Sequence, residues 1–336
     1  MTSFGYASLY RSTPVVLSAL VVCNLIVLLL HLVLGDYPIP VGDALRAATG
    51  GGDPQYGFVV HTLRLPRALV ALLAGASLAL SGVLLQGITR NPLAAPGVVG
   101  LNAGASLTAV AAIIVFPSIP VALLPVAAFA GALSAGTLSY VLAWRRGLSP
   151  VRLLLVGVGI SASAGAIVTF LLTIGKINDA KTAVVWMTGS VYGRSWEHFW
   201  PLLPWLLALL PLSLLLAKQL DLLQLGDDMA RGLGSRLELS RGILLLIGIS
   251  LAGSAVAMAG TIGFVGLMAP HMSRYLIGAG SRRLIPAAAL MGGLIVMLAD
   301  LFGRIMLRPI EIPCGILIAI VGAPYMLYLL YKKRHR

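Results

Sequence analysis

Charged residues are scarce in this sequence, and acidic residues are the scarcest of them. Asp, Glu, Lys and Arg together make up 10% of the 336 residues, whereas a soluble domain carries about a quarter. Hydrophobic residues make up 59%, and the mean hydropathy is +0.97. The composition excludes an ordinary water-soluble globule and predicts an all-α integral membrane protein.

Cysteine is also nearly absent. The two cysteines, Cys23 and Cys314, each lie inside an apolar run. Two thiols cannot build a disulfide framework or a tetrahedral metal site. Clusters of His, Cys, Asp and Glu with metal-ligand spacing are missing as well. We therefore expect neither a metal nor a cofactor.

The basic residues outnumber the acidic ones by 24 to 11, which gives a net charge of +13. An excess of this size can indicate nucleic-acid binding. Here the basic residues lie in short gaps between apolar runs, and no stripe of arginines alternates with aromatics. We therefore expect no nucleic-acid partner.

Sequence patterns for catalysis are missing too. The phosphate-binding pattern Gly-x-x-x-x-Gly-Lys-Ser/Thr does not occur, so any ATP would be hydrolysed by another subunit. Ser81 followed by Gly82 resembles a serine nucleophile superficially, and only His31 and His271 could supply a base from within a span. A lone serine in a small-residue helix more often packs. We expect a non-catalytic chain.

Apolar runs long enough to cross a membrane are abundant. A bilayer needs about 20 apolar residues per helix. Gly, Pro, Arg and Asp divide the chain into ten such spans: 14–34, 68–88, 98–116, 119–143, 153–175, 199–217, 243–260, 262–278, 284–303 and 312–331. The first is too long for a signal-peptide core and lacks a cleavage site. The eighth is interrupted by Pro270, His271 and Arg274.

The distribution of basic residues tests the number of spans, because Lys and Arg near span ends favour the cytoplasm. Ten spans with both termini inside place 16 of the 24 basic residues on the cytoplasmic side. The other eight lie outside: Arg46, Arg64, Arg67, Lys176, Lys181, Arg194, Arg304 and Arg308. The distribution supports ten spans with both termini on the cytoplasmic side. Several outer arginines lie directly at span ends and need another explanation.

Most gaps between spans are short, so we interpret residues 1–336 as one transmembrane domain without an inserted soluble domain. A five-plus-five division would invert the second half relative to the first, as in many transporters. The similarity of residues 97–101 and 263–267 hints at such a repeat. The chain also contains 38 glycines, many of them near Ala and Ser. Gly75, Gly82, Gly131 and Gly136 predict close helix packing in a bundle.

Asp300 and Arg304 are the most conspicuous charges inside an apolar run. Their i,i+4 spacing predicts a structural ion pair on one helix face. Arg64 and Arg67 lie just outside the second span. Arginines gathered on one face can bind carboxylates bidentately, although snorkelling to lipid headgroups is the alternative.

Two further segments combine polar and apolar residues in a regular way. Residues 221–239 on the predicted cytoplasmic side contain Gly226, Gly232 and Gly234, which divide the segment into two short helices joined by a turn. Such a knob can fit a cleft on a cytoplasmic protein, although a solvated loop is the alternative. In the fifth span, small and hydroxyl residues recur every four positions: Ser161, Gly165, Thr169 and Thr173. This stripe is either a helix contact or the wall of a transport pathway.

Several strings, taken together and in order, resemble the FecCD family of ABC importer permeases. They are Leu-Arg-Leu-Pro-Arg at 63–67, Gln-Gly-Ile-Thr-Arg-Asn-Pro-Leu-Ala at 86–94, Pro-Gly-Val-Val-Gly at 96–100, Trp-Met-Thr-Gly-Ser at 186–190, Gly-Phe-Val-Gly-Leu-Met-Ala-Pro-His at 263–271, Ala-Asp at 299–300 with Arg304, Pro313 with Gly315, and Gly-Ala-Pro at 322–324. The resemblance covers about residues 60–331.

The resemblance implies a permease that pairs with a second permease subunit, identical or paralogous. It also implies two cytoplasmic ATPase subunits and a periplasmic or lipid-anchored binding protein. The chain itself would lie among membrane lipids in a bacterial cytoplasmic (inner) membrane. Four groups of residues carry the implied roles. They are Arg64, Arg67 and Arg304 for docking the binding protein; Asp228, Ala230, Leu233 and Gly234 for coupling to the ATPase; Asn91, Pro92, Leu93 and Ser149 for the cytoplasmic gate; and Ser161, Gly165, Thr169 and Thr173 for the pathway.

The implied substrate is an iron–siderophore complex of the ferric citrate or hydroxamate type. Residues 188–190 followed by 193–196 look more like these permeases than like the vitamin B12 permease. Haem and vitamin B12 remain alternatives within the family. Ala95 and Thr261 depart from the residues common in relatives. A secondary transporter that works without an ATPase is the rival class, and the shortage of intramembrane carboxylates argues against it.

Overall fold

The computed structural model describes residues 13–145, 147–234, 236–307 and 309–334, with side chains up to Lys332. These residues are overwhelmingly helical, and their only pairing of strand type is an isolated bridge between Trp144 and Leu148. The all-α prediction is confirmed. Of the basic residues counted above, Arg11, Arg146, Arg308 and Arg336 lie outside the described residues, and only the backbone is described at Lys333 and Arg334.

Eight helices or helix runs of the described chain are long and apolar enough to cross a membrane. They contain α2 (Thr13–Val33), α5 (Leu65–Thr89), α7 (Leu124–Ala143), α8 (Pro150–Ile174), α10 (Trp196–Leu215), α13 (Leu237–Ala259), α15 (Ser281–Ile305) and α16 (Cys314–Arg334). α5 continues α4 (Pro54–Phe58) and the π-helical turn η1 (Val59–Arg64), and α7 continues the short turn η3 (Val121–Leu123). Each corresponds to a predicted span.

The third and eighth predicted spans are helical but short. α6 (Leu101–Val115) has 15 residues and α14 (Val265–Ile277) has 13, which correspond to about 22 and 20 Å of helix against a hydrocarbon core of about 30 Å. The cause lies before each helix, where Gly100 and Phe264 have φ of 88° and 62°. A left-handed residue cannot continue an α-helix. Both segments are therefore half-helices that begin after an irregular turn.

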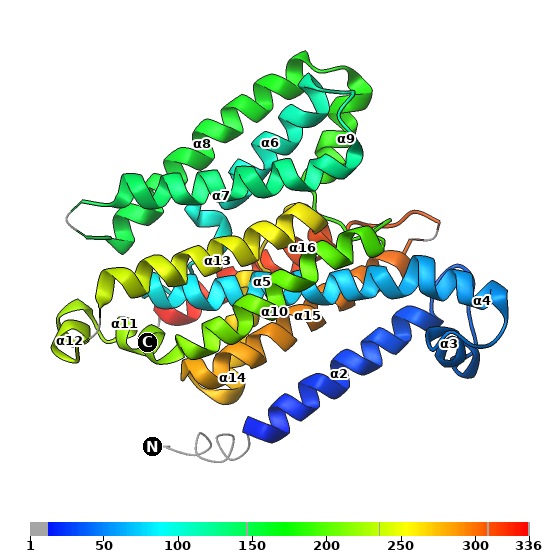
Figure 1. Cartoon of the computed structure of the whole chain (residues 1–336), viewed down its shortest axis with the longest axis horizontal. Helices are drawn as coiled ribbons and strands as arrows, with labels where there is room; N and C mark the ends of the chain where they lie inside the picture. Colours follow the sequence, from blue (N-terminus) through cyan, green and yellow to red (C-terminus); the bar gives the residue numbers. More distant parts are fainter. Residues whose placement is uncertain (1–12, 146, 235, 308, 335–336) are drawn as a thin grey trace.

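Helix contacts follow the pattern expected of the five-plus-five repeat. If α5, α6, α7 and α8 correspond to α13, α14, α15 and α16, the main contacts of one half have counterparts in the other. Thus α5 packs on α15 and α14, while α13 packs on α7 and α6. In Figure 1, α5 runs from the end that carries α4 toward α12 (Asp227–Gly232), and α13 runs the opposite way. The arrangement supports an inverted repeat.

The core forms where glycines let helix backbones touch. A Cβ atom at Gly75 would overlap the Gly292 carbonyl on α15, and one at Gly82 would overlap the Gly266 carbonyl on α14. These contacts confirm the predicted close packing, because only a residue without a side chain permits such an approach. Ser81 is fully buried beside them and donates to the Gly248 carbonyl at 2.7 Å. Its role is in packing, as expected.

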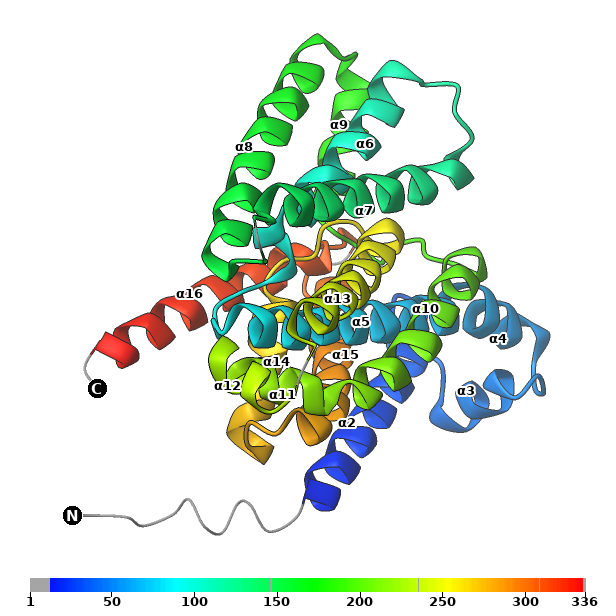
Figure 2. The same ribbon diagram turned by 60° about the vertical axis from the view of Figure 1, so that its left-hand side comes forward.

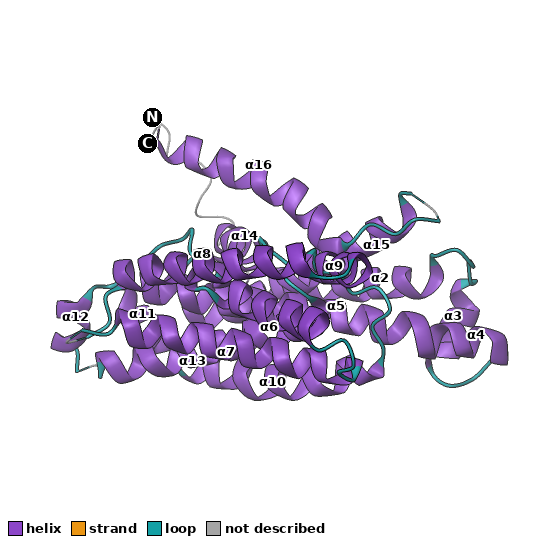
Figure 3. Ribbon diagram, turned by 90° about the horizontal axis from the view of Figure 1, so that it is seen from above, coloured by secondary structure: helices purple, strands orange, loops and turns teal. Residues whose placement is uncertain are grey.

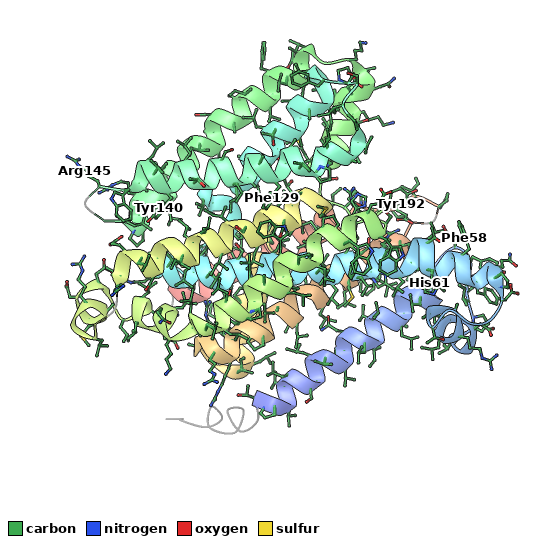
Figure 4. The ribbon with its side chains drawn as sticks, viewed as in Figure 1. Phe58, His61, Phe129, Tyr140, Arg145 and Tyr192 are labelled. Atoms are coloured by element: carbon green, nitrogen blue, oxygen red, sulfur yellow. The ribbon has the colours of Figure 1, made fainter. Side chains whose placement is uncertain are left out.

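The bundle has two functional ends, which Figures 1 and 3 show on opposite sides. α11 (Ala217–Gln224) and α12 lie at one end, which we call the α12 end. α3 (Val41–Ala48) and α4 lie at the other, the α3 end. Figure 4 shows Arg145 and Tyr140 toward the α12 end, and Phe58, His61 and Tyr192 toward the α3 end. α3 and α9 (Ile177–Met187) were not predicted from the sequence.

A layer made of α6, α7, α8 and α9 covers one side of the central helices α5, α13 and α15 (Figures 1 and 2). Within it, α8 contacts α6, α7, α9 and the turn η2 (Pro96–Val99). Only 22% of the most apolar stretch of α8 is buried, and the same holds for α16. Both helices therefore have long apolar faces that no other part of the described chain covers.

Candidate functional site: two polar ends of a helical bundle

A cavity of about 480 Å³ opens at the α3 end. Its charged lining includes all three arginines predicted for docking, Arg64, Arg67 and Arg304, which come from η1, α5 and α15. Arg194, Asp36 and Glu311 complete that lining. The structure thus brings the three predicted residues together. Each of their side chains is nonetheless mostly buried, with 5–7% exposed.

Arg64 and Arg304 donate hydrogen bonds to carbonyls at the end of α2. The last carbonyls of a helix lack intrahelical donors, and positive charge near them is favourable. Arg64 donates to the Leu32 carbonyl at 2.6 Å, to the Val33 carbonyl at 3.2 Å and to the Tyr37 carbonyl. Arg304 donates to the His31 carbonyl at 3.0 Å. The two guanidinium groups therefore cap the carboxyl end of α2.

Arg67, and not Arg304, is the partner of Asp300, which corrects the predicted pair on α15. The Nε and NH2 groups of Arg67 donate to the two Asp300 oxygens at 2.8 and 2.9 Å. Helix α5 packs directly on α15, and the flat guanidinium matches both carboxylate oxygens at once. Arg67 also donates to Glu311 at 2.7 Å and lies under the Tyr192 ring, 5.5 Å from its centroid.

A second cavity of about 470 Å³ adjoins the first. The two share Asp36, Tyr192, Arg194 and Glu311, and the second extends along α9. Arg194 bonds to Nε2 of His198 at 2.9 Å. Arg194 is one of the basic residues predicted to lie outside, and its sequence position alone predicts no role for it. The signal that could have found it is its position beside Tyr192 and Gly193 in the run already compared with the family.

The predicted coupling segment, 221–239, contains the end of α11, the whole of α12 and the start of α13, with a break at Leu225 and Gly226 and another after Gly232. The predicted break is therefore confirmed. Ala230 is fully buried, while Asp228, Leu233 and Gly234 are exposed. Gly234 has φ of +80° and nothing near its absent Cβ. The exposed residues form an outward knob, and Ala230 seats that knob on the bundle.

The four predicted gate residues lie in two loops, one after α5 and one before α8. In the loop after α5, the Asn91 side chain accepts from the Leu93 amide at 3.0 Å, and Pro92 lies between them, exposed. Ser149 precedes α8 as its N-cap. A Cβ at Gly157 of α8 would overlap the Val98 carbonyl of η2, so α8 presses on the segment that follows the first loop.

The polar stripe of α8 faces away from the rest of the chain. Ser161 is half-buried, and Gly165, Thr169 and Thr173 are exposed. The hydroxyls of Thr169 and Thr173 donate to their own helix, to the carbonyls of Gly165 and Thr169 at 3.0 and 2.8 Å. The hydroxyls of Thr169 and Thr173 therefore do not join α8 to another helix of the described chain. The stripe then either lines a transport pathway or contacts a second subunit.

Metal and nucleophile chemistry receive no support from the side chains that the structure describes. Among them no group of three His, Cys, Asp or Glu residues could hold a metal ion. Cys23 is exposed on α2 and Cys314 is buried, and both are free thiols.

Known proteins resemble this chain along nearly its whole length. It is 45% identical over 288 residues to the Fe(3+)-citrate import system permease protein YfmE of Bacillus subtilis, covering 86% of each chain. It is 42% identical over 306 residues to the Fe(3+) dicitrate transport system permease protein FecD of Escherichia coli, covering 91% and 95% of the two chains.

A solved inward-facing structure of a metal-chelate type ABC transporter superposes with a TM-score of 0.86 at 32% identity, covering 95% of this chain and 99% of that one. The sequence pattern of the FecCD transport family matches residues 23–332. The resemblance inferred from the ordered strings is thereby confirmed. The multi-pass helical bundle described above belongs to the FecCD transport family.

Proposed function

We propose that the chain is the membrane-spanning permease subunit of a binding-protein-dependent ABC importer that carries a ferric chelate, of the citrate or hydroxamate type, into the cytoplasm. The observation that carries the proposal is the 45% identity to a Fe(3+)-citrate permease over 86% of both chains. In this proposal the α12 end faces the cytoplasm, with both termini, and the α3 end faces outward. Separate subunits hydrolyse ATP, and the permease itself is not catalytic.

The proposed machinery uses both ends of the bundle. Asp228, Leu233 and Gly234 would enter a cleft on each of two ATPase subunits, with Ala230 seating the helix. A second permease subunit, identical or paralogous, would cover α8, so that its polar stripe lines the pathway between the two subunits. The loops at Asn91 and Ser149 would narrow the cytoplasmic mouth. The small and uncharged side chains of the stripe suit a bulky chelate that must be released quickly.

Uptake in proteoliposomes tests the function. The permease, its ATPase and its binding protein should accumulate radiolabelled iron supplied as ferric citrate or a ferric hydroxamate, with ATP present on the cytoplasmic side. ATP-driven uptake of haem or vitamin B12 in place of iron would overturn the substrate assignment. Ion-driven flux without the ATPase would support a secondary transporter. The bidentate Arg67–Asp300 pair argues against that class, because this intramembrane carboxylate is already paired.

The coupling role is tested with charge at the exposed knob. Leu233→Glu should release the ATPase, because a carboxylate would be desolvated in an apolar cleft. Lys218→Glu, an exposed change at the same end but before residue 221, should leave co-purification intact. Unchanged co-purification of the Leu233→Glu protein would contradict the coupling role.

For docking, we propose that an acidic side chain of a periplasmic or lipid-anchored binding protein enters the arginine-lined cavity at the α3 end. Arg64 and Arg304 also cap α2, so their reversal would disturb folding. Arg194→Glu is the cleaner test, and it should weaken binding-protein affinity by about tenfold or more, since like charges at an interface cost several kcal/mol. Arg46→Glu, exposed on α3 outside the cavity, is the matched control. Equal affinities would contradict docking here.

A further inference from the structure

Two arginines from different parts of the chain meet on one carboxylate at the α12 end. Asp227, the first residue of α12, accepts through Oδ1 from Arg241 of α13 at 2.5 Å and also from Arg90. Arg90 is the left-handed residue that ends α5, with φ of 52°. Arg241 is completely buried, whereas the side chains of Arg90 and Asp227 are 32% and 35% exposed. The bond from Arg241 is thus anchored in the protein interior, whereas the bond from Arg90 is accessible to solvent.

The same residues hold the loop that precedes α8. Arg241 donates to the Leu148 carbonyl at 3.1 Å, and the Leu148 amide donates to Glu238 at 3.0 Å. Besides its bond to Asp227, Arg90 donates to the Leu223 carbonyl of α11 at 2.7 Å. Leu148 is the neighbour of Ser149, and Arg90 is the neighbour of Asn91. The network of Asp227, Arg90, Arg241 and Glu238 therefore joins α12 to both loops that carry the predicted gate.

The charges of this network balance. Two arginines face two carboxylates, and Arg241 contacts both of the latter. Burial acts to raise the pKa of Asp227, but hydrogen bonds and charge from Arg241 and Arg90 outweigh it and hold the pKa below its usual range. Asp227 is therefore ionised at neutral pH, and it binds both guanidinium groups by charge-assisted hydrogen bonds.

We infer that Asp227 is a positioning residue that transmits displacement of α12 to the two gate loops through Arg90 and Arg241. The inference rests on the proposed function, because it takes the α12 knob as the place where the ATPase acts. Met229 and Leu233 are each 59% exposed on that knob, so force applied there reaches Asp227 within one or two turns of chain. The buried Arg241 bond moves α13 and Leu148 together, and the exposed Arg90 bond can open and reclose.

The test measures gate movement and ATPase binding separately, in the full complex in lipid nanodiscs. Ser149→Cys serves as the reporter in a Cys23→Ser background, because Cys314 is buried. Its rate of labelling by a polar maleimide is measured with and without ATP and vanadate. In the reporter protein the nucleotide should change this rate. Asp227→Asn should abolish that change while the ATPase still co-purifies, and Asp227→Glu, which keeps the carboxylate, should restore part of it.

Three comparisons make the result decisive. Asp43→Asn, the same charge change at the α3 end, should leave the nucleotide response intact. Arg90→Gln should lose the nucleotide response as Asp227→Asn does. The Arg90 variant replaces the Asp227 variant in the test if the latter fails to fold. A full response in a folded Asp227→Asn complex would overturn the inference, as would loss of its ATPase, which would make Asp227 a binding residue. Failure of the native chain to bind an ATPase would instead overturn the proposed function.

Discussion

At the residue scale, Arg67 joins two carboxylates at the α3 end. Its guanidinium binds both oxygens of Asp300 and one oxygen of Glu311. Asp300 is 1% exposed, so its charge depends on Arg67 for compensation. Removing one partner of a buried ion pair costs about 3–5 kcal/mol, because the other charge is left desolvated.

Arg67→Ala should therefore lower the stability of the detergent-solubilised protein by about 3–5 kcal/mol, measured by thermal or denaturant unfolding. Arg67→Ala combined with Asp300→Ala should lose less than Arg67→Ala alone, since no orphaned carboxylate remains. Arg46→Ala, an exposed change on α3, should stay within about 0.5 kcal/mol of the native protein. Equal losses in the single and double variants would contradict the assignment of Arg67 as the partner of Asp300.

The sequence predicted which residues at this scale are unusual, but not all of their contacts. Helical spacing identifies residues on one face of the same helix, which suggested Arg304 for Asp300. The partner instead comes from α5, 233 residues away along the chain, and residue spacing holds no information about such a contact. The cavity that gathers Arg64, Arg67 and Arg304 agrees with the family resemblance. The contact between Asp227 and Arg241 could be found only from the fold.

At the element scale, the close crossing of α5 with α15 decides how the core is built. Gly75 and Gly292 face each other with backbone against backbone, and a Cβ on either would collide with the opposite carbonyl. The contact cannot be relieved by rotating a side chain, because both colliding groups belong to rigid helices. A substitution here must move the helices apart.

Gly75→Ala should thus destabilise the protein by about 1–3 kcal/mol, the usual cost of overpacking. The loss should appear as a lower yield of monodisperse protein and a lower unfolding temperature. Gly159→Ala on α8, where nothing lies within 4 Å of the added Cβ, is the matched control and should be neutral or slightly stabilising. A Gly75→Ala protein as stable as the Gly159→Ala protein would show that α5 and α15 are not in contact as described.

Helix positions were the most predictable part of the fold, because about 20 apolar residues in a row have few alternatives. The half-length of α6 and α14 was less predictable. It depends on the left-handed residues Gly100 and Phe264, and a phenylalanine at such a position has no sequence signal of its own. The helices α3 and α9 have only 8 and 11 residues, too few to cross a membrane, so the hydropathy pattern does not identify them.

At the scale of the whole molecule, the two ends of the bundle's long axis carry different features. The α3 end holds the arginine-lined cavities, and the α12 end holds the knob and the Asp227 network. The distribution of Lys and Arg predicts that the α12 end is cytoplasmic. This orientation determines which end can meet a binding protein and which can meet an ATPase.

Single cysteines test that orientation in a Cys23→Ser background. Thr49→Cys at the α3 end should react with a membrane-impermeant maleimide in intact spheroplasts. Met229→Cys on α12 should react only in inside-out vesicles, and both side chains are exposed in the structure. A lysate labelled in detergent should show both reacting, which controls for thiol access. Labelling of Met229→Cys in intact spheroplasts would reverse the topology.

The cap on α2 has a consequence for how the protein is made. His31 and Arg304 are separated by 273 residues, so the first helix leaves the ribosome long before the side chain that closes its last turn exists. Arg64 arrives early and can hold the Leu32 and Val33 carbonyls, while the His31 carbonyl must wait for nearly the entire chain. The last turn of α2 is therefore completed only after α15 has been made, and a chain truncated before residue 304 would leave the His31 carbonyl without this donor.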